Sequence, residues 1–154
     1  TVDKNATTCK DLFVVSSADY GLLENNQNKI KGRTVKTDGS FATIVSGEAP
    51  QILMLISDKE GLCLSAIFLP DSLEPLIFDA ESTTVAVTFP TAFVKIDKTG
   101  YEEIQKLKSF QKLYQFLKDE LKKKTLTSIT ANFGQEGDIF TDLMFELNDE
   151  LMSK

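Results

Sequence analysis

The side chains that could perform catalysis in this chain are carboxylates, hydroxyls and two cysteines, because its 154 residues include no histidine. Without histidine, Ser-His-Asp triads, Cys-His dyads and every metal site that needs an imidazole are excluded. Cys9 and Cys63 are also too few for a four-cysteine metal site within one chain. Cys63 has apolar neighbours in the sequence, and these do not favour the reactive thiolate. We therefore predict no catalytic cysteine.

Two polar motifs are better explained by backbone structure than by chemistry. Ser82-Thr83-Thr84 lacks the surroundings of a nucleophile elbow or a Ser-x-x-Lys pattern, so it predicts a helix cap or a strand edge. Asp38-Gly39 is not followed by the regularly spaced oxygen ligands of a calcium-binding loop. No glycine-rich phosphate loop occurs. We predict no catalytic, cofactor-binding or metal-binding residues, and no cofactor.

The carboxylates near the end of the chain form an acidic helical face. They are Asp138, Asp142, Glu146, Asp149 and Glu150. Asp138 and Asp142 suit a helix N-terminus, where negative charge is favourable. We predict a solvated face, and the alternative is a surface for a cation or a basic partner.

Charge and hydropathy restrict the partners. Lys and Arg total 17 against 23 Asp and Glu, and the only arginine is Arg33, so we expect no nucleic-acid binding. No window approaches the roughly 18–20 apolar residues that span a bilayer, so we expect no membrane span. The sequence starts at Thr1 without a methionine, so an N-terminal segment could have been removed, and the chain could be part of a longer protein.

The elements that would position these residues change character near residue 80. We expect a polar leader over residues 1–10, a β-sandwich over 11–80, and a helical region over 81–154 that is packed on the sandwich or appended to it. Thr37-Asp38-Gly39 predicts a hairpin turn between strands at 29–36 and 40–46, with Phe41 pointing into the core. A second hairpin joins 51–57 to 62–69 through a loop at 58–61 that ends in glycine.

The second half of the chain has helical periodicity. Residues 79–96 are ambiguous, and we favour a helix that Pro90 would end or kink. Apolar residues at steps of three and four predict helix over 101–123, either as one bent helix or as two with Ser109 as a cap. The same pattern recurs over 138–152.

Part of the sequence also resembles a known family of β-sandwich modules. Gly32, Thr37, Asp38, Gly39, Phe41, Asp58 and Gly61 match the turns of a carboxypeptidase-regulatory-like or transthyretin-like β-sandwich module. Residues 79–89 are similar to a segment that follows such modules in uncharacterised bacterial surface or lipoprotein-like sequences. The resemblance covers about residues 30–89. It implies an extracytoplasmic accessory or binding role and brings no catalytic residues.

The predicted fold class is α+β, an antiparallel β-sandwich followed by a helical C-terminal region. The predicted function is a non-catalytic extracytoplasmic binding or interaction module, secreted or at the cell surface. One alternative is a carboxylate-dependent hydrolase acting on glycans, which needs two carboxyl groups about 5–9 Å apart. Another is an intracellular regulatory protein that docks through its C-terminal helices.

Two further expectations depend on compartment and packing. Cys9 and Cys63 could form one disulfide if the protein is exported; otherwise Cys63 belongs to the core and Cys9 is an exposed thiol. The helical stripes could form an interaction surface for a protein, an apolar ligand or a second copy, unless the sandwich covers them. The residues of that surface would be Tyr114, Leu117, Leu121, Phe140, Leu147 and Leu151.

Overall fold

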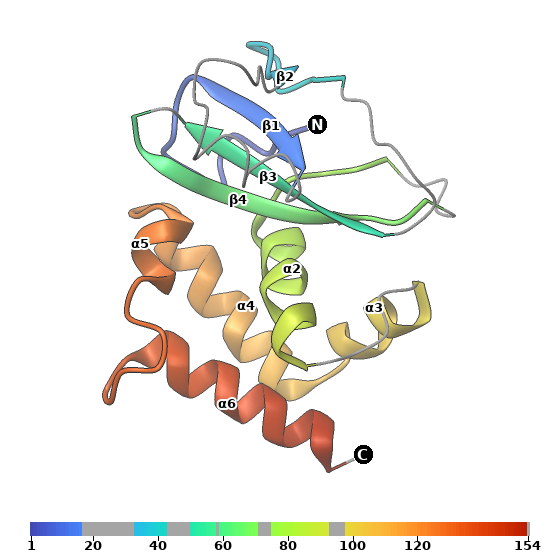
Figure 1. Cartoon of the computed structure of the whole chain (residues 1–154), viewed down its shortest axis with the longest axis vertical. Helices are drawn as coiled ribbons and strands as arrows, with labels where there is room; N and C mark the ends of the chain where they lie inside the picture. Colours follow the sequence, from blue (N-terminus) through green and yellow to red (C-terminus); the bar gives the residue numbers. More distant parts are fainter. Residues whose placement is uncertain (17–32, 43–49, 58, 71–74, 93–97, 154) are drawn as a thin grey trace.

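A computed structural model describes residues 1–16, 33–42, 50–57, 59–70, 75–92 and 98–153 of the chain (Figure 1). Its strands form one antiparallel sheet of four strands in the order β2-β1-β3-β4. The strands are β1 (Leu12–Ser16), β2 (Arg33–Thr34), β3 (Gln51–Ser57) and β4 (Gly61–Phe68). Three of them are of ordinary length, whereas β2 has only two residues and lies at one edge.

The predicted β-sandwich is wrong, because the described residues contain a single sheet, and the layer that packs on this sheet is helical. The helices lie on one side of the sheet, and α2 (Ala80–Ala92) and α5 (Leu126–Thr130) pack directly on β4 (Figure 1). Apolar strands such as β3 and β4 need cover, but helices provide it as well as a second sheet does. Strand composition alone therefore does not identify the covering layer.

The ambiguous segment after residue 79 forms α2, as we favoured. A reciprocal cap begins this helix: the Ser82 backbone N–H donates to Asp79 Oδ1 at 2.7 Å, and the Asp79 N–H donates to Ser82 Oγ at 2.9 Å. Pro90 falls close to the end of the helix at Ala92, which agrees with its inability to continue the hydrogen-bond ladder. Residues 93–97 of the predicted segment lie outside the described residues.

The predicted helical stretch over 101–123 is two helices. They are α3 (Lys98–Gln105) and α4 (Lys108–Glu120), and the residue that begins α4 is the extended Leu107 rather than Ser109. The stretch at 138–152 forms α6 (Ile139–Met152), which is capped by Asp138 accepting from the Thr141 N–H at 2.9 Å. The short α5 was not predicted.

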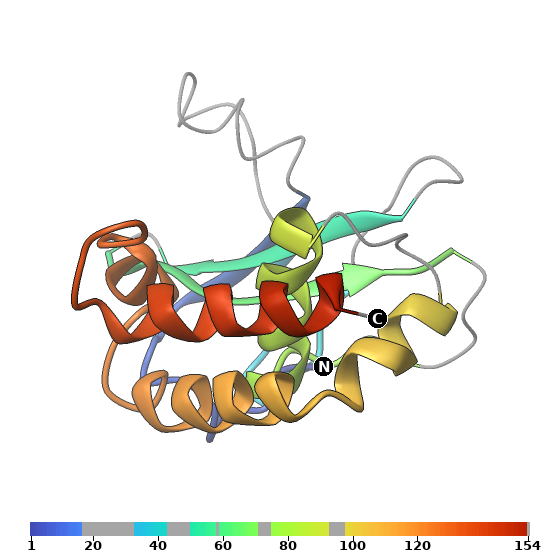
Figure 2. The ribbon, with the colours of Figure 1, turned by 90° about the horizontal axis from the view of Figure 1, so that it is seen from below.

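The helical core lies between α2, α4 and α6 (Figures 1 and 2). Helices α4 and α6 run side by side in both views and are in contact, whereas α3 lies away from them to one side. Fully buried side chains fill the interior, among them Phe110, Leu113, Leu117, Leu121 and Leu147. Burial of each such side chain contributes about 1.5–3 kcal/mol.

Both predicted turns form, but no strand directly follows the turn at residues 37–39. The hairpin of β3 and β4 is confirmed. At the other turn Gly39 has φ 87°, and the Lys36 N–H donates to Ser40 O at 2.8 Å. Residues 40–42 are not in a strand, and 29–32 and 43–46 lie outside the described residues. Phe41 is half-buried and packs against the core, with its ring centroid 5.5 Å from that of the buried Phe78.

Residues 1–10, expected as a polar leader, are packed into the fold. Val2 forms a parallel bridge with Phe78, and its N–H donates to Gly39 O at 2.8 Å. Val2, Ala6 and Cys9 are buried in the core. The apolar residues of this segment are spaced irregularly, so no strand or helix period reveals their burial.

The outer edge of β4 is covered by hydroxyl groups. Ser65 donates its backbone N–H to Thr83 Oγ1 at 3.0 Å, and its carbonyl accepts from Ser82 Oγ at 2.8 Å. Further along the same strand, the Leu62 N–H donates to Thr127 Oγ1 of α5 at 3.0 Å. Ser82 thus serves as the predicted helix cap, whereas Thr83 lies in α2 and covers the edge of β4, a role that the sequence did not predict. These hydrogen bonds satisfy backbone groups of an edge strand, which could otherwise pair with a strand of another chain.

No helix among the residues that the structure describes is long and apolar enough to span a bilayer.

Candidate functional site

A groove of about 900 Å³ lies between the N-terminal segment and the β2 edge of the sheet. Two stretches line it, one of residues 4 and 7–13 and the other of residues 34–37. Its volume falls in the range of pockets that hold small organic ligands, about 300–1,000 Å³. The groove is therefore a candidate ligand site.

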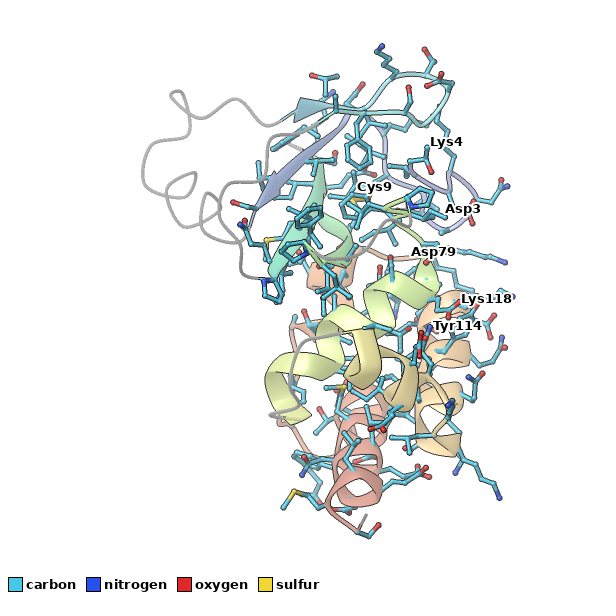
Figure 3. The ribbon with its side chains drawn as sticks, turned by 90° about the vertical axis from the view of Figure 1, so that its right-hand side faces the viewer. Asp3, Lys4, Cys9, Asp79, Tyr114 and Lys118 are labelled. Atoms are coloured by element: carbon cyan, nitrogen blue, oxygen red, sulfur yellow. A yellow bond between two sulfur atoms is a disulfide. The ribbon has the colours of Figure 1, made fainter. Side chains whose placement is uncertain are left out.

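The disulfide between Cys9 and Cys63 fixes one wall of this groove. Its S–S distance is 2.06 Å and its Cα–Cα distance is 6.4 Å, so the structure joins the two cysteines considered from the sequence. Cys9 itself lines the groove, and its N–H donates to Thr7 Oγ1 at 3.2 Å. Figure 3 shows Cys9 beside the sheet and Lys4, which comes earlier in the same segment.

The wall continues through Asp11 into β1. Asp11 has φ 56°, in the left-handed region that non-glycine residues seldom occupy. The opposite wall is tied to it, because the Val35 N–H donates to Leu12 O at 3.0 Å. Backbone strain of this kind persists only where the surrounding structure enforces it, and it is frequent at binding sites.

The lining combines apolar and cationic groups. Leu12 is buried, and Phe13 and Val35 are half-buried. The polar part of the lining consists of four threonines, three lysines and one carboxylate: Thr7, Thr8, Thr34, Thr37, Lys4, Lys10, Lys36 and Asp11. This groove can offer hydroxyl hydrogen bonds and positive charge beside an apolar surface.

Two carboxylates near the groove are engaged in local structure. Asp38 Oδ1 accepts from Ser40 Oγ at 2.6 Å and from the Ser40 N–H at 2.9 Å. These hydrogen bonds, and more weakly the charges of Lys36 and Lys4, hold the pKa of Asp38 below its usual value. Glu60 Oε2 accepts from the Lys10 backbone N–H at 3.1 Å.

A second polar cluster lies on α4, beside the start of α2 (Figure 3). Lys118 Nζ is 5.9 Å from the centre of the Tyr114 ring. Burial, and then the charges of Glu81, Asp79 and Asp3, raise the pKa of Tyr114. The phenol therefore stays protonated at neutral pH and is not poised as a base or nucleophile.

The interaction surface predicted from the helical stripes is mostly interior. Leu117, Leu121, Phe140 and Leu147 are buried within this chain, and Tyr114 and Leu151 are half-buried. The helices and the sheet cover one another, which leaves no exposed stripe at these six positions. These side chains are buried because α2 packs against both α4 and α6 and covers their apolar faces.

Other apolar side chains are exposed instead. Phe133 and Phe145 are 44% and 55% exposed, and their ring centroids lie 6.2 Å apart. Ile139, at the start of α6, is 60% exposed. The sequence pattern did not single these residues out.

The acidic face predicted on the last helix is partly used for structure. Asp138 caps α6, Glu146 pairs with Lys112 at 2.6 Å, and Glu150 contacts the start of α4. Asp142 and Asp149 are exposed. Within the described ranges, no three His, Cys, Asp or Glu side chains gather to hold a metal ion.

Sequence reasoning missed the groove lysines because it treated residues 1–10 as a leader. The available signal was composition: the segment TVDKNATTCK combines lysine and threonine with one of the two cysteines of the chain. In comparisons with protein-family models, curated proteins and solved structures, no match to the chain was found.

Proposed function

We propose that the chain is a non-catalytic binding module of an extracytoplasmic protein, and that its ligand occupies the groove between residues 4–13 and 34–37. The observation that carries this proposal is the groove itself, with the Cys9–Cys63 disulfide in its wall. Disulfides persist mainly in oxidising compartments, which supports a location outside the cytoplasm.

The walls of the groove are tied together before any ligand binds. The N-terminal segment is anchored by the disulfide, by the bridge of Val2 to Phe78 and by the hydrogen bond from Val2 to Gly39. The second wall is joined to β1 through Val35 and Leu12. A preorganised site loses less conformational entropy on binding than a mobile one, so this arrangement favours a binding role.

The binding function is tested by NMR with ¹⁵N-labelled protein and a set of soluble small organic molecules that includes acids, amines and neutral compounds. We expect binders to shift the amide signals of residues 4–13 and 34–37. A Thr34→Trp variant should weaken these shifts because the indole fills the groove, whereas Gln111→Trp adds the same ring on exposed α4 and should not. Shifts confined to other surfaces, or none from the whole set, would refute the proposal.

The location is tested by titrating thiols in protein recovered from its source organism and unfolded without reductant. The proposal predicts no free thiol per chain. Two free thiols would show that the protein resides in a reducing compartment.

A further inference from the structure

The groove has a charge opposite to that of the chain around it. The whole protein carries 17 basic and 23 acidic residues, whereas three lysines and one aspartate line the groove and the Asp38 carboxylate lies beside it. Concentration of one sign of charge in a concave surface raises the local concentration of ligands of the opposite sign. A groove with excess positive charge in an acidic protein therefore selects against cations and for anions.

The groove lysines are available to a ligand. Within the described residues, Lys4, Lys10 and Lys36 form no ion pair, whereas Lys112 and Lys124 pair with Glu146 and Glu120. The nearby Asp38 carboxylate is oriented toward Ser40 through two hydrogen bonds. The charges of Lys4 and Lys36 still act on the Asp38 carboxylate, so an anion in the groove would be a second negative partner for these ammonium groups.

The rest of the lining indicates that the anion has an apolar body. Phe13 is half-buried and lies on the same face of the sheet as Thr34, whereas Leu12 and Val35 pack into the core. The volume of about 900 Å³ far exceeds the space of an inorganic ion. Threonine hydroxyls among these groups can donate hydrogen bonds to carboxylate, sulfate or phosphate oxygens. Apolar lining with a few placed polar groups is the usual composition of a small-molecule site.

From these observations we propose that the groove binds an amphipathic anion, which has an aromatic or aliphatic body and one carboxylate, sulfate or phosphate group. The inference rests on the proposed binding function and specifies the chemistry of the ligand. Lys4 and Lys36 pair with the acidic group, and Phe13, which is on the same face of the sheet as Thr34, contacts the body.

Three probes with the same body test the head-group preference. Naphthalene-2-carboxylate, naphthalene-2-carboxamide and 2-naphthylmethylammonium are titrated into the labelled protein at low ionic strength, and the shifts of the groove amides give each dissociation constant. We expect the carboxylate to bind most tightly and the ammonium least tightly. Added NaCl should weaken only the carboxylate, because salt screens its attraction to the lysines.

Charge variants locate the preference. Lys4→Gln and Lys36→Gln should each weaken carboxylate binding about fivefold, the effect of one unit charge at roughly 4 Å in water, and leave carboxamide binding unchanged. Lys106→Gln makes the same change in net charge on an exposed residue beyond α3 and should have no effect. Thermal unfolding of each variant confirms that the fold is retained.

The outcomes separate the two proposals. If the carboxamide or the ammonium binds the groove as tightly as the carboxylate, or if Lys106→Gln weakens binding as much as Lys4→Gln, the anion inference is wrong while the binding function stands. If the carboxylate does not bind the groove at all, the inference is wrong, and the wider set of small molecules decides the function on its own.

Discussion

Glu150, near the end of α6, caps the first turn of α4 by accepting the backbone N–H of Ser109 on Oε2 at 3.2 Å. Its other oxygen accepts the N–H of Lys108 at 3.1 Å. Leu107, at the cap position of α4, provides no side-chain acceptor. A carboxylate from another helix thus satisfies two of the N–H groups that a helix start leaves without partners, and its charge favours the positive end of the helix dipole.

Replacement of Glu150 with alanine should lower the free energy of unfolding by about 1 kcal/mol, the usual cost of a lost helix cap. Glu150→Gln should cost less, because the amide oxygen can still accept one N–H. Urea unfolding measures both. Asp149→Ala removes a carboxylate from the neighbouring exposed position and serves as the control. Equal losses of unfolding free energy for Glu150→Ala and Asp149→Ala would show that the effect comes from the removed charge and not from the lost helix cap.

Reduction of the disulfide should destabilise the protein by roughly 4 kcal/mol through the entropy that the unfolded chain regains. The bridge spans 54 positions and holds the N-terminal segment against β4. Denaturant unfolding with and without reductant measures the difference. A Cys9→Ala/Cys63→Ala variant should be insensitive to reductant. An unchanged midpoint for the natural chain after reduction would show that the bridge contributes nothing to folding.

Substitution of Gly39 should destabilise the protein more than substitution of Gly134, which has a positive φ but no close neighbour. A Cβ at Gly39 would lie 2.7 Å from Val2 O, whereas Gly134, with φ 92°, has nothing within 4 Å of such an atom. Both Gly→Ala changes incur the backbone strain, and only Gly39→Ala also displaces Val2. Gly39→Ala should therefore cost roughly 1–3 kcal/mol more than Gly134→Ala in thermal or urea unfolding. Equal losses would mean that Val2 does not pack against this turn.

Thr83→Val should cost about 1–3 kcal/mol, because it leaves the buried Ser65 N–H without an acceptor. Thr84→Val is the matched control: this hydroxyl is also fully buried, but it only donates to Ala80 O within α2. The Ala80 carbonyl still has its helical partner after that change, so the loss should be smaller. Unfolding free energies that do not differ between the two variants would contradict the role of Thr83 at the β4 edge.

Local signals in the sequence indicated much of the secondary structure. The apolar runs around residues 58–61, the capping Ser82 and the periodicity of α6 depend on near neighbours, and these elements form. The single sheet could not be inferred in this way, because strands covered by helices and strands covered by strands have the same composition. The resemblance to a sandwich module rested on turn residues, which occur in many folds.

The candidate site was beyond local reasoning for a different reason. Lys4 and Lys36 are distant in the sequence, and only the docking of the N-terminal segment brings them to one groove. That docking depends on Val2, Ala6 and Cys9, whose burial follows no period. The break between α3 and α4 was likewise ambiguous, because the apolar stripe continues across it.

A crystal structure of the protein grown with naphthalene-2-carboxylate tests the central claim most directly. The account predicts the naphthalene ring against Phe13 in the groove, with the carboxylate paired to Lys4 or Lys36. A carboxylate turned toward solvent, or a ligand bound instead against the exposed rings of Phe133 and Phe145, would contradict it.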